Sequence, residues 1–224
     1  METIEISPKE YYLNPITTFT TMGKHNHEPL ISLAILASGG GSNAESIVQY
    51  FSQNKNIKIV GIWTNYSKSG VLDRKTGIDV KVFSPGDDDD SLLMFWKKEG
   101  VNAIILAGYL KPIPIVFLQH FRNKIINIHP SLLPKHGGKG MYGIAIHRAA
   151  IRSLDKESGI TVHVVTEKYD EGPILFQCET KIQIGETPEA LQARVLKMEH
   201  WAYPRVIEAY LQNKALPKKS ECPQ

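Results

Sequence analysis

The chain has 224 residues, of which 42% are hydrophobic and 22% charged, and its formal net charge is +3. This composition is typical of a globular protein with one α/β domain or two small ones, and the charge is too small to indicate nucleic-acid binding. No run of about 18 apolar residues occurs and the first residues are acidic, so neither a membrane span nor a secretory signal is expected. With only two cysteines, Cys178 and Cys222, the sequence favours a reducing cytoplasm over a disulfide-bonded fold.

Short apolar runs alternate with segments whose apolar residues recur at helical spacing. Almost continuously apolar strands are typical of a parallel sheet that helices cover on both faces. We therefore expect an α/β, Rossmann-like fold with a mostly parallel twisted sheet, in which ligands bind beyond the carboxyl ends of the strands. The expected strands are 31–37, 57–64, 80–83, 103–107 and 125–129, and the expected helices are 44–53, 70–76, 91–99 and 113–121.

The pattern changes after residue 134, where a glycine-rich loop begins. We expect a helix at 144–153, a C-terminal antiparallel strand pair at 161–165 and 174–180, and a long C-terminal helix at 188–211 that is kinked at Pro204. The domain organisation follows from these limits. It consists of an N-terminal extension at 1–29, a single domain at 30–216 and a disordered tail at 217–224.

The loop after the first expected strand is rich in glycine. Residues 39–44 read Gly-Gly-Gly-Ser-Asn-Ala and match the motif G-x-G-x-x-A. Backbone N–H groups at a helix N-terminus bind phosphate, and glycine lets the ligand approach. A dinucleotide site also needs an acid about 20 residues later, where Trp63, Thr64 and Asn65 supply none. The loop therefore favours a phosphate monoester over NAD, and a plain tight turn is the alternative.

Asn127 and His129 stand two residues apart at the end of an apolar run, so their side chains point the same way. Asp170 lies in a later loop that could fold back onto them. The amide donates a hydrogen bond, the imidazole donates or transfers a proton, and the carboxylate orients and charges the imidazole. This set suits a carbonyl carbon that becomes tetrahedral while its oxygen gains charge. The alternative is a histidine with only structural hydrogen bonds.

Other polar residues give weaker signals. His163 alternates with Thr161 along a strand, so it either lines the crevice or lies in the core, and His147 is expected to be structural. Glu199 on the long helix would hold an ammonium or amide if it faced the crevice, but the sequence alone favours a solvated glutamate. Neither H-E-x-x-H nor a paired C-x-x-C motif occurs, so no metal site is expected.

Taken together, these strings resemble the phosphoribosylglycinamide formyltransferase (GAR transformylase) family of folate-dependent enzymes. The resemblance implies transfer of a formyl group from 10-formyltetrahydrofolate to the amine of 5'-phosphoribosylglycinamide in purine biosynthesis, without a metal. It runs from about Leu33 to Leu211. It rests on Ser-Gly-Gly-Gly-Ser-Asn at 38–43, Asn-Ile-His-Pro-Ser-Leu-Leu-Pro at 127–134, Tyr-Asp-Glu-Gly-Pro at 169–173 and Glu-His-Trp-Ala-Tyr-Pro at 199–204.

The resemblance also implies a role for each matching residue. Asn127 contacts the formyl oxygen, His129 is the proton donor, and Asp170 raises the pKa of His129. Other matching positions hold the substrates. Gly41, Ser42 and Asn43 bind the phosphate, Glu199 holds the glycinamide part, and the folate is bound by Leu110, Lys111, Pro112, Ile113, Asn127, Thr166, Glu167, Lys168, Tyr169 and Asp170.

Among the departures of the chain from the family, two concern whole segments. The loop between Lys135 and His147 is longer and glycine-rich where better-known members have Tyr-Pro-Gly-Leu, so it could close differently over the substrate. The extension at 1–29 has no counterpart in the family.

Four other functions are weighed against this one. A formyltransferase for a nucleotide-linked amino sugar would not need this phosphate loop. A methionyl-tRNA formyltransferase is expected to carry a further C-terminal domain, and a formyltetrahydrofolate hydrolase an N-terminal regulatory domain, for which the chain offers no room. A non-catalytic nucleotide-binding module would have no use for Asn127, His129 and Asp170 together.

Overall fold

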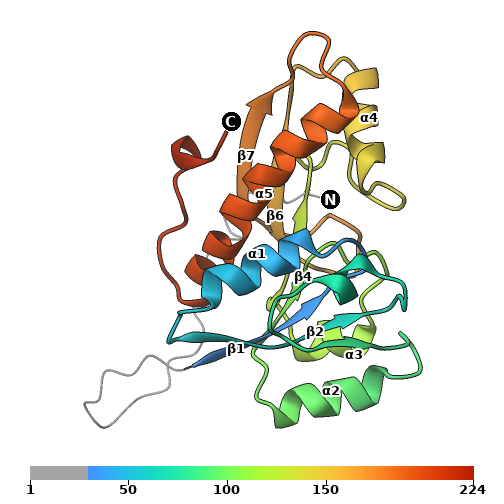
Figure 1. Cartoon of the computed structure of the whole chain (residues 1–224), viewed down its shortest axis with the longest axis vertical. Coiled ribbons are helices and arrows are strands. Elements are labelled where there is room, and N and C mark those ends of the chain that lie inside the picture. The colour runs from blue at the N-terminus through green and yellow to red at the C-terminus, as the bar shows by residue number, and fades with distance from the viewer. Residues whose placement is uncertain (1–29) are drawn as a thin grey trace, which may run out of the picture.

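A computed structural model describes residues 30–224, so the expected extension at 1–29 lies outside the described residues. Seven strands form one sheet in the order β3-β2-β1-β4-β5-β6-β7 (Figure 1). The first five are parallel, and β6 runs antiparallel to both β5 and β7, which confirms the predicted fold class. The strands are β1 (Ile31–Leu36), β2 (Ile57–Thr64), β3 (Val80–Val82), β4 (Ala103–Leu106), β5 (Ile125–His129), β6 (Glu157–Val164) and β7 (Ile174–Lys181).

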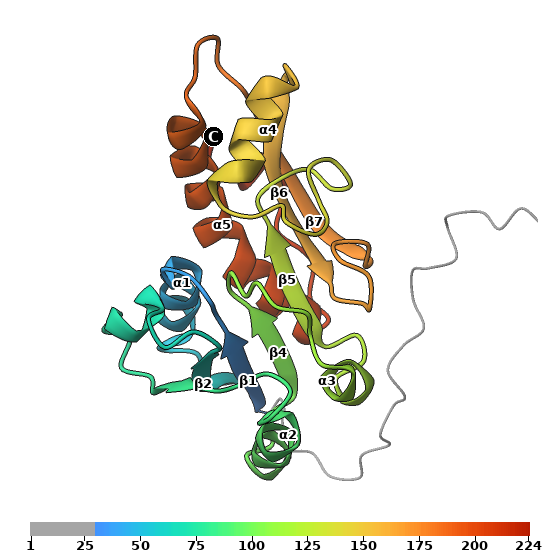
Figure 2. The ribbon, with the colours of Figure 1, turned by 90° about the vertical axis from the view of Figure 1, so that its right-hand side faces the viewer.

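Helices cover both faces of the sheet (Figure 2). Successive residues of β1 alternate between two buried clusters: Leu33 and Ile35 pack with α1 and α5, whereas Ala34 and Leu36 pack with α2 and α3. In the described part of the chain, none of the helices is both long enough and apolar enough to cross a membrane. The helices are α1 (Ser42–Phe51), α2 (Asp89–Lys98), α3 (Ile115–His120), α4 (Ile144–Arg152) and α5 (Pro188–Leu211), with 3-10 turns η2 (Gly70–Asp73) and η3 (Lys219–Glu221).

The long helix α5 runs without a break through Pro204. Proline has no N–H, so the carbonyl of His200 one turn earlier loses its helical donor. The hydroxyl of Ser46 on α1 donates to that carbonyl at 3.0 Å. Nearby, the hydroxyl of the fully buried Tyr203 lies 2.9 Å and 2.8 Å from carbonyl oxygens of β4 and β5. These contacts fix α5 to α1 and to the centre of the sheet.

Strand β6 begins at Glu157, four residues before the predicted start at 161. The extra residues include Gly159, which carries no strand signal because it has no side chain. A Cβ at Gly159 would collide with the carbonyl oxygen of Cys178 on the neighbouring strand. The close approach of β7 therefore requires glycine here, and only the tertiary structure shows it.

Two expectations about the C-terminal region are wrong. The tail at 217–224 is not disordered, because η3 forms there and Cys222 is only 4% exposed. The cysteines are not free, because Cys222 pairs with Cys178 of β7 in a disulfide that spans 44 residues of sequence. Both errors have one cause: the tail folds back onto β7, and the spacing of two isolated cysteines does not indicate such a contact.

The order of the strands indicates where the ligand crevice lies. Strands β1 and β4 are neighbours, while the chain leaves β1 toward β2 on one side and leaves β4 toward β5 on the other. The loops after β1 and β4 therefore diverge and leave space beyond their carboxyl ends. In open α/β sheets this switch in direction marks the usual ligand site.

Candidate active site

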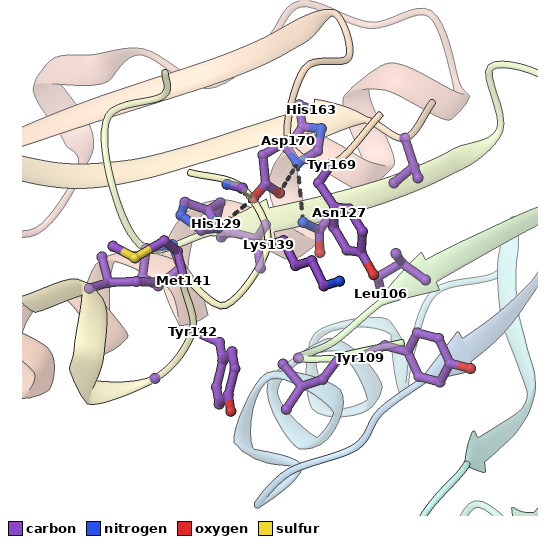
Figure 3. Close-up of a pocket in the computed structure, with 18 of the residues that line it drawn as sticks. Leu106, Tyr109, Asn127, His129, Lys139, Met141, Tyr142, His163, Tyr169 and Asp170 are labelled. Atoms are coloured by element: carbon purple, nitrogen blue, oxygen red, sulfur yellow. Dashed lines mark hydrogen bonds and ion pairs between the residues drawn. The ribbon is translucent and has the colours of Figure 1, made fainter. Parts of the chain in front are cut away.

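A cavity of about 700 Å³ lies at this position (Figure 3). Its lining comes from the start of α1, the loops that follow β4 and β5, the end of β6 with the loop after it, and one side of α5. Of the residues that the sequence singled out for the site, all but Gly41 line it. Those that do are Ser42, Asn43, Leu110, Lys111, Pro112, Ile113, Asn127, His129, Thr166, Glu167, Lys168, Tyr169, Asp170 and Glu199.

Gly41 does not line the cavity itself but immediately precedes α1, whose first residues do. Its φ is +75°, and a Cβ there would lie 2.8 Å from the Cα of Val71. The loop is held from the same side, since the N–H of Val71 donates to the carbonyl of Gly39 and Nε of Arg74 donates to the carbonyl of Gly40. The first N–H groups of a helix have no partner within the helix. The start of α1 therefore presents N–H groups at the cavity wall in an arrangement that can bind an anion.

Ser38 joins this loop to two neighbouring strands. Its hydroxyl donates to Oδ1 of Asn65 at 2.6 Å and accepts from the N–H of Leu110 at 3.0 Å. Asn65 follows β2, where a dinucleotide site would place the acid that binds ribose. Here that position serves to connect the loops after β1, β2 and β4, which agrees with the sequence argument against NAD.

Asp170 lies between two histidines beyond the ends of β5 and β6 (Figure 3). Its Oδ2 is 3.7 Å from Nδ1 of His129, and its Oδ1 is 3.6 Å from Nε2 of His163. The N–H of Gly138 donates to Oδ2 at 2.8 Å and fixes the carboxylate. Asn127, His129 and Asp170 are thus brought together as the sequence suggested, and His163, which the sequence left open, joins them.

His163 orients the amide of Asn127. The two residues are paired across β5 and β6, and Nδ2 of Asn127 lies 3.1 Å from Nε2 of His163. Nδ1 of His163 lies 3.0 Å from the carbonyl of Val164, which can only accept, so Nδ1 carries a hydrogen. In a neutral ring Nε2 then accepts from the Asn127 amide, which retains a second N–H for a ligand.

Burial and charge act against each other at the two central groups. Burial lowers the pKa of His129, while the charge of Asp170 and the hydrogen bond to the carbonyl of His136 raise it, and the net shift is downward. Burial would raise the pKa of Asp170, but the close contact with His163, the hydrogen bond from Gly138 and the charges that the two histidines carry when protonated lower it on balance. Asp170 is therefore a carboxylate at neutral pH, and its charge raises the pKa of His129 as the resemblance implies, although burial outweighs it.

Glu199 is not the solvated glutamate that the sequence alone favours. It is 7% exposed, lines the cavity from α5, and accepts a hydrogen bond of 3.2 Å from Nδ2 of Asn43. Burial raises its pKa to about 7, against the lowering effect of the Asn43 bond. A buried carboxyl group that titrates near neutrality, beside the anion-binding end of α1, can bind an ammonium group or accept a proton from it.

Sequence reasoning did not assign several other lining residues. His147, expected to be structural, is buried beside the cavity; its Nδ1 has no partner among the described residues, and burial lowers its pKa to about 4. Lys139 and Tyr142 of the glycine-rich loop form one wall of the cavity (Figure 3). The only sequence signal for this wall was the departure of the loop from the family pattern. Within residues 30–224, no group of three or more His, Cys, Asp or Glu side chains is placed to hold a metal ion.

Comparison with known proteins agrees with this geometry. The formyl transferase family model matches residues 31–207. The chain is 42% identical over 195 residues to the chloroplastic phosphoribosylglycinamide formyltransferase of Arabidopsis thaliana, covering 82% of this chain and 67% of the relative. It is 35% identical over 208 residues to phosphoribosylglycinamide formyltransferase of Haemophilus influenzae, covering 83% and 96%. The chain spans about two thirds of the length of the plant relatives it matches.

Solved structures give the same result. The phosphoribosylglycinamide formyltransferase of Brucella melitensis superposes with a TM-score of 0.72 at 33% identity, covering 84% of this chain and 100% of that one. Glycinamide ribonucleotide transformylase 1 of Geobacillus kaustophilus superposes with a TM-score of 0.74 at 33% identity, covering 81% and 99%. By sequence, fold and site, the chain belongs to the formyl transferase family, among the phosphoribosylglycinamide formyltransferases.

Proposed function

We propose that the protein transfers the formyl group of 10-formyltetrahydrofolate to the amine of 5'-phosphoribosylglycinamide, a step of purine biosynthesis. One observation carries this proposal. A single cavity contains both the N-terminus of α1 and the group formed by Asn127, His129 and Asp170. The first is a site for a phosphate, and the second is a site for a carbonyl group under attack, so the acceptor is an amine attached to a phosphate-bearing part.

The acceptor is held at two ends. The backbone at Gly41, Ser42 and Asn43 binds the phosphate through N–H groups at the helix N-terminus. Glu199 lies on the neighbouring helix and is bonded to the side chain of Asn43, so it meets the amine end of the same molecule. Its carboxyl group has a pKa of about 7 and is ionised once an ammonium group binds beside it.

The folate occupies the other side of the cavity. The two loops at 110–113 and 166–170 line it, and their backbone groups would pair with the polar edge of a pterin, while Leu106, Leu118 and Val165 contribute apolar surface. A flat heterocycle held by backbone groups and apolar side chains is typical of cofactor sites. The formyl group then lies toward Asn127, the residue that the resemblance assigns to its oxygen.

The reaction is a direct acyl transfer. The amine nitrogen attacks the formyl carbon, and the carbonyl electron pair moves onto oxygen. The second N–H of Asn127 and the N–H of protonated His129 stabilise this oxyanion, and Asp170 supplies the negative charge that favours the imidazolium. As the tetrahedral intermediate collapses, the electron pair on oxygen re-forms the carbonyl and the bond to the folate nitrogen breaks. His129 gives its proton to that nitrogen and takes up the proton that the attacking amine loses, so it ends the reaction protonated. The proposed reaction needs neither a metal nor ATP.

One assay separates this function from its alternatives. The protein is incubated with 10-formyltetrahydrofolate in the presence and absence of phosphoribosylglycinamide, and deformylated folate is measured. We expect release only when the acceptor is present. Release without an amine would indicate a hydrolase. Release that requires a nucleotide-linked amino sugar would indicate a different acceptor, and its absence under every condition would indicate a binding module.

We also propose the cytoplasm as the compartment, although the disulfide between Cys178 and Cys222 counts against the reducing environment on which the sequence argument rested. Two plant relatives carry the word chloroplastic in their names, so a plastid is the alternative compartment. Fractionation of cells that express the full chain distinguishes the two locations.

A further inference from the structure

The segment after cis-Pro134 passes directly over the reacting groups, and its backbone contacts both of them. Nε2 of His129 donates to the carbonyl of His136 at 2.8 Å. Two residues later, the N–H of Gly138 donates to Asp170. The start of the segment is anchored by the hydroxyl of Ser131, which donates to the carbonyl of Lys135 at 2.6 Å. The position of this backbone therefore determines how the imidazole and the carboxylate face each other.

The carbonyl of His136 decides which nitrogen of His129 can exchange a proton. A carbonyl oxygen only accepts, so Nε2 keeps its hydrogen in both the neutral and the charged ring. Nδ1, 3.7 Å from Oδ2 of Asp170, is then the nitrogen that gains and loses a proton. In the opposite tautomer a lone pair on Nε2 would face the lone pairs of the carbonyl. The structure thus selects one tautomer through a backbone contact.

The side chain of His136 holds that carbonyl in place. His136 has a φ of +53°, a left-handed conformation that is unfavourable for residues other than glycine. Its Nε2 lies 2.7 Å from Oδ2 of Asp155, a contact that is an ion pair when His136 is protonated. Asp155 is itself fixed after α4, since its N–H donates to the carbonyl of Ala150 and its side chain is 12% exposed.

A second cation reaches Asp155 from the same segment. Nζ of Lys135 lies 3.2 Å from its Oδ1, but the lysine side chain is 66% exposed and contributes little. The two contacts differ in another way. Only His136 carries the carbonyl that meets His129, so the less exposed histidine is the member of this pair that can act on the site.

We propose that His136 and Asp155 are positioning residues: their contact holds the carbonyl of His136 against Nε2 of His129 and so fixes Nδ1 as the nitrogen that carries the transferred proton. This inference rests on the formyl transfer proposed above. Neither residue is among those that line the cavity. In sequence Asp155 stands 26 residues after His129, in a turn to which no motif assigns a role.

Turnover by matched variants gives the first test. His136→Gly removes the anchor without straining the left-handed backbone, whereas His136→Gln keeps a donor at the reach of Nε2. We expect His136→Gly and Asp155→Ala to lower kcat about tenfold, the effect of one lost hydrogen bond, with little change in either KM. We expect His136→Gln to retain most of the turnover. Lys135→Ala is the control and should match the wild type, since it removes only the exposed cation.

The second test reads the ring directly. In protein labelled with ¹⁵N-histidine, the signals of His129 are assigned by their loss in His129→Ala, and all variants are checked for folding by thermal unfolding. Asp155→Asn, which keeps the side-chain shape, replaces Asp155→Ala if the latter does not fold. We expect neutral His129 to carry its hydrogen on Nε2 in the wild type and to show both tautomers in His136→Gly, with His136→Gln restoring the wild-type signals.

Each outcome either supports or overturns the positioning role. A neutral wild-type ring with its hydrogen on Nδ1 would overturn the inference. So would a His136→Gly variant that loses turnover while its His129 signals stay unchanged, because that result describes general destabilisation. Wild-type protein with the expected ring signals but no formyl transfer would reject the proposed function and leave the positioning role standing, so the two failures are distinguishable.

Discussion

Two walls of the same cavity are built in opposite ways. The cradle, residues 38–43 at the start of α1, is fixed by neighbours on every side, and a Cβ at Gly41 would meet the backbone of Val71. The wall formed by residues 138–143 includes the exposed Lys139 and Tyr142, and a Cβ on any of its three glycines would meet nothing within 4 Å. Close packing thus requires glycine at Gly41 of the cradle, in addition to its left-handed φ, whereas the three glycines of the wall are required by backbone conformation alone.

This difference separates binding from chemistry. Under the proposed function, a rigid cradle binds the phosphate without rearrangement. The start of the exposed wall and the residues that lead into it supply the backbone groups that meet His129 and Asp170. Changes in the cradle are therefore expected to affect substrate binding and stability. Changes near the wall are expected to affect turnover, apart from those at its exposed side chains.

The largest effect is expected at the chemical end of the cavity. His129→Ala removes an oxyanion donor and the proton carrier, so kcat should fall by about 10²–10³-fold or more. The cradle does not contact His129, so the affinity for phosphoribosylglycinamide measured by calorimetry should remain near that of the wild type. Near-normal turnover in this variant would contradict the assignment of the chemistry to this end of the cavity.

Glu199 tests whether the cradle side contains a titrating group. Its pKa rises from 4.5 to about 7 on burial, so between these pH values the folded protein holds a proton that the unfolded chain has lost. The contribution of Glu199 to stability should therefore be greatest below pH 4.5 and fall by roughly 3 kcal/mol as pH rises to about 7. Glu199→Gln should abolish this part of the slope in urea unfolding. Glu189→Gln, at an exposed position of the same helix, is the matched control and should leave the slope unchanged.

Gly41→Ala tests the rigidity of the cradle. The left-handed φ and the contact with Val71 should lower the free energy of unfolding by about 1–2 kcal/mol. The KM for phosphoribosylglycinamide should rise while kcat changes less, because the start of α1 is displaced. For the loss of stability the control is Gly40→Ala, where a Cβ meets nothing within 4 Å. Equal stability of the two variants would show that the cradle is not tightly packed.

The smallest effect is expected at the exposed wall. Lys139→Ala removes a cation that lines the cavity from solvent, so the KM for the anionic substrates should rise by less than about fivefold. The difference from wild type should shrink as salt is added, since exposed charges are screened. A large and salt-independent loss of turnover would instead place Lys139 in the chemistry and make the two walls alike.

Local patterns predicted most of the fold. Strands β2 and β5 and helix α5 begin and end where the sequence placed them, because continuous apolar runs and helical spacing report burial directly. The union of Asn127, His129 and Asp170 also followed from local signals, since strand alternation and loop position suffice for it.

Other features depend on contacts that no local pattern encodes. Glu199 is buried because Asn43, 156 residues away, faces it across α1 and α5. His136 meets Asp155 across a loop and a helix, and Cys222 meets Cys178 through the return of the tail. In each case the neighbouring residues in the sequence have the composition of an ordinary protein surface. The environment that gives it a role is created only when distant segments pack.

Helix α5 carries two residues, one turn apart, that have different structural roles. Glu199 reaches the cavity, and Tyr203 holds the carbonyls of β4 and β5, the second of which leads to His129. The distance between the proposed amine site at Glu199 and the proposed proton carrier, His129, is therefore set by a helix and not by a loop. To change the acceptor, the side chain at position 199 could therefore be replaced by one of different chemistry while Tyr203 keeps α5 in its place on the sheet.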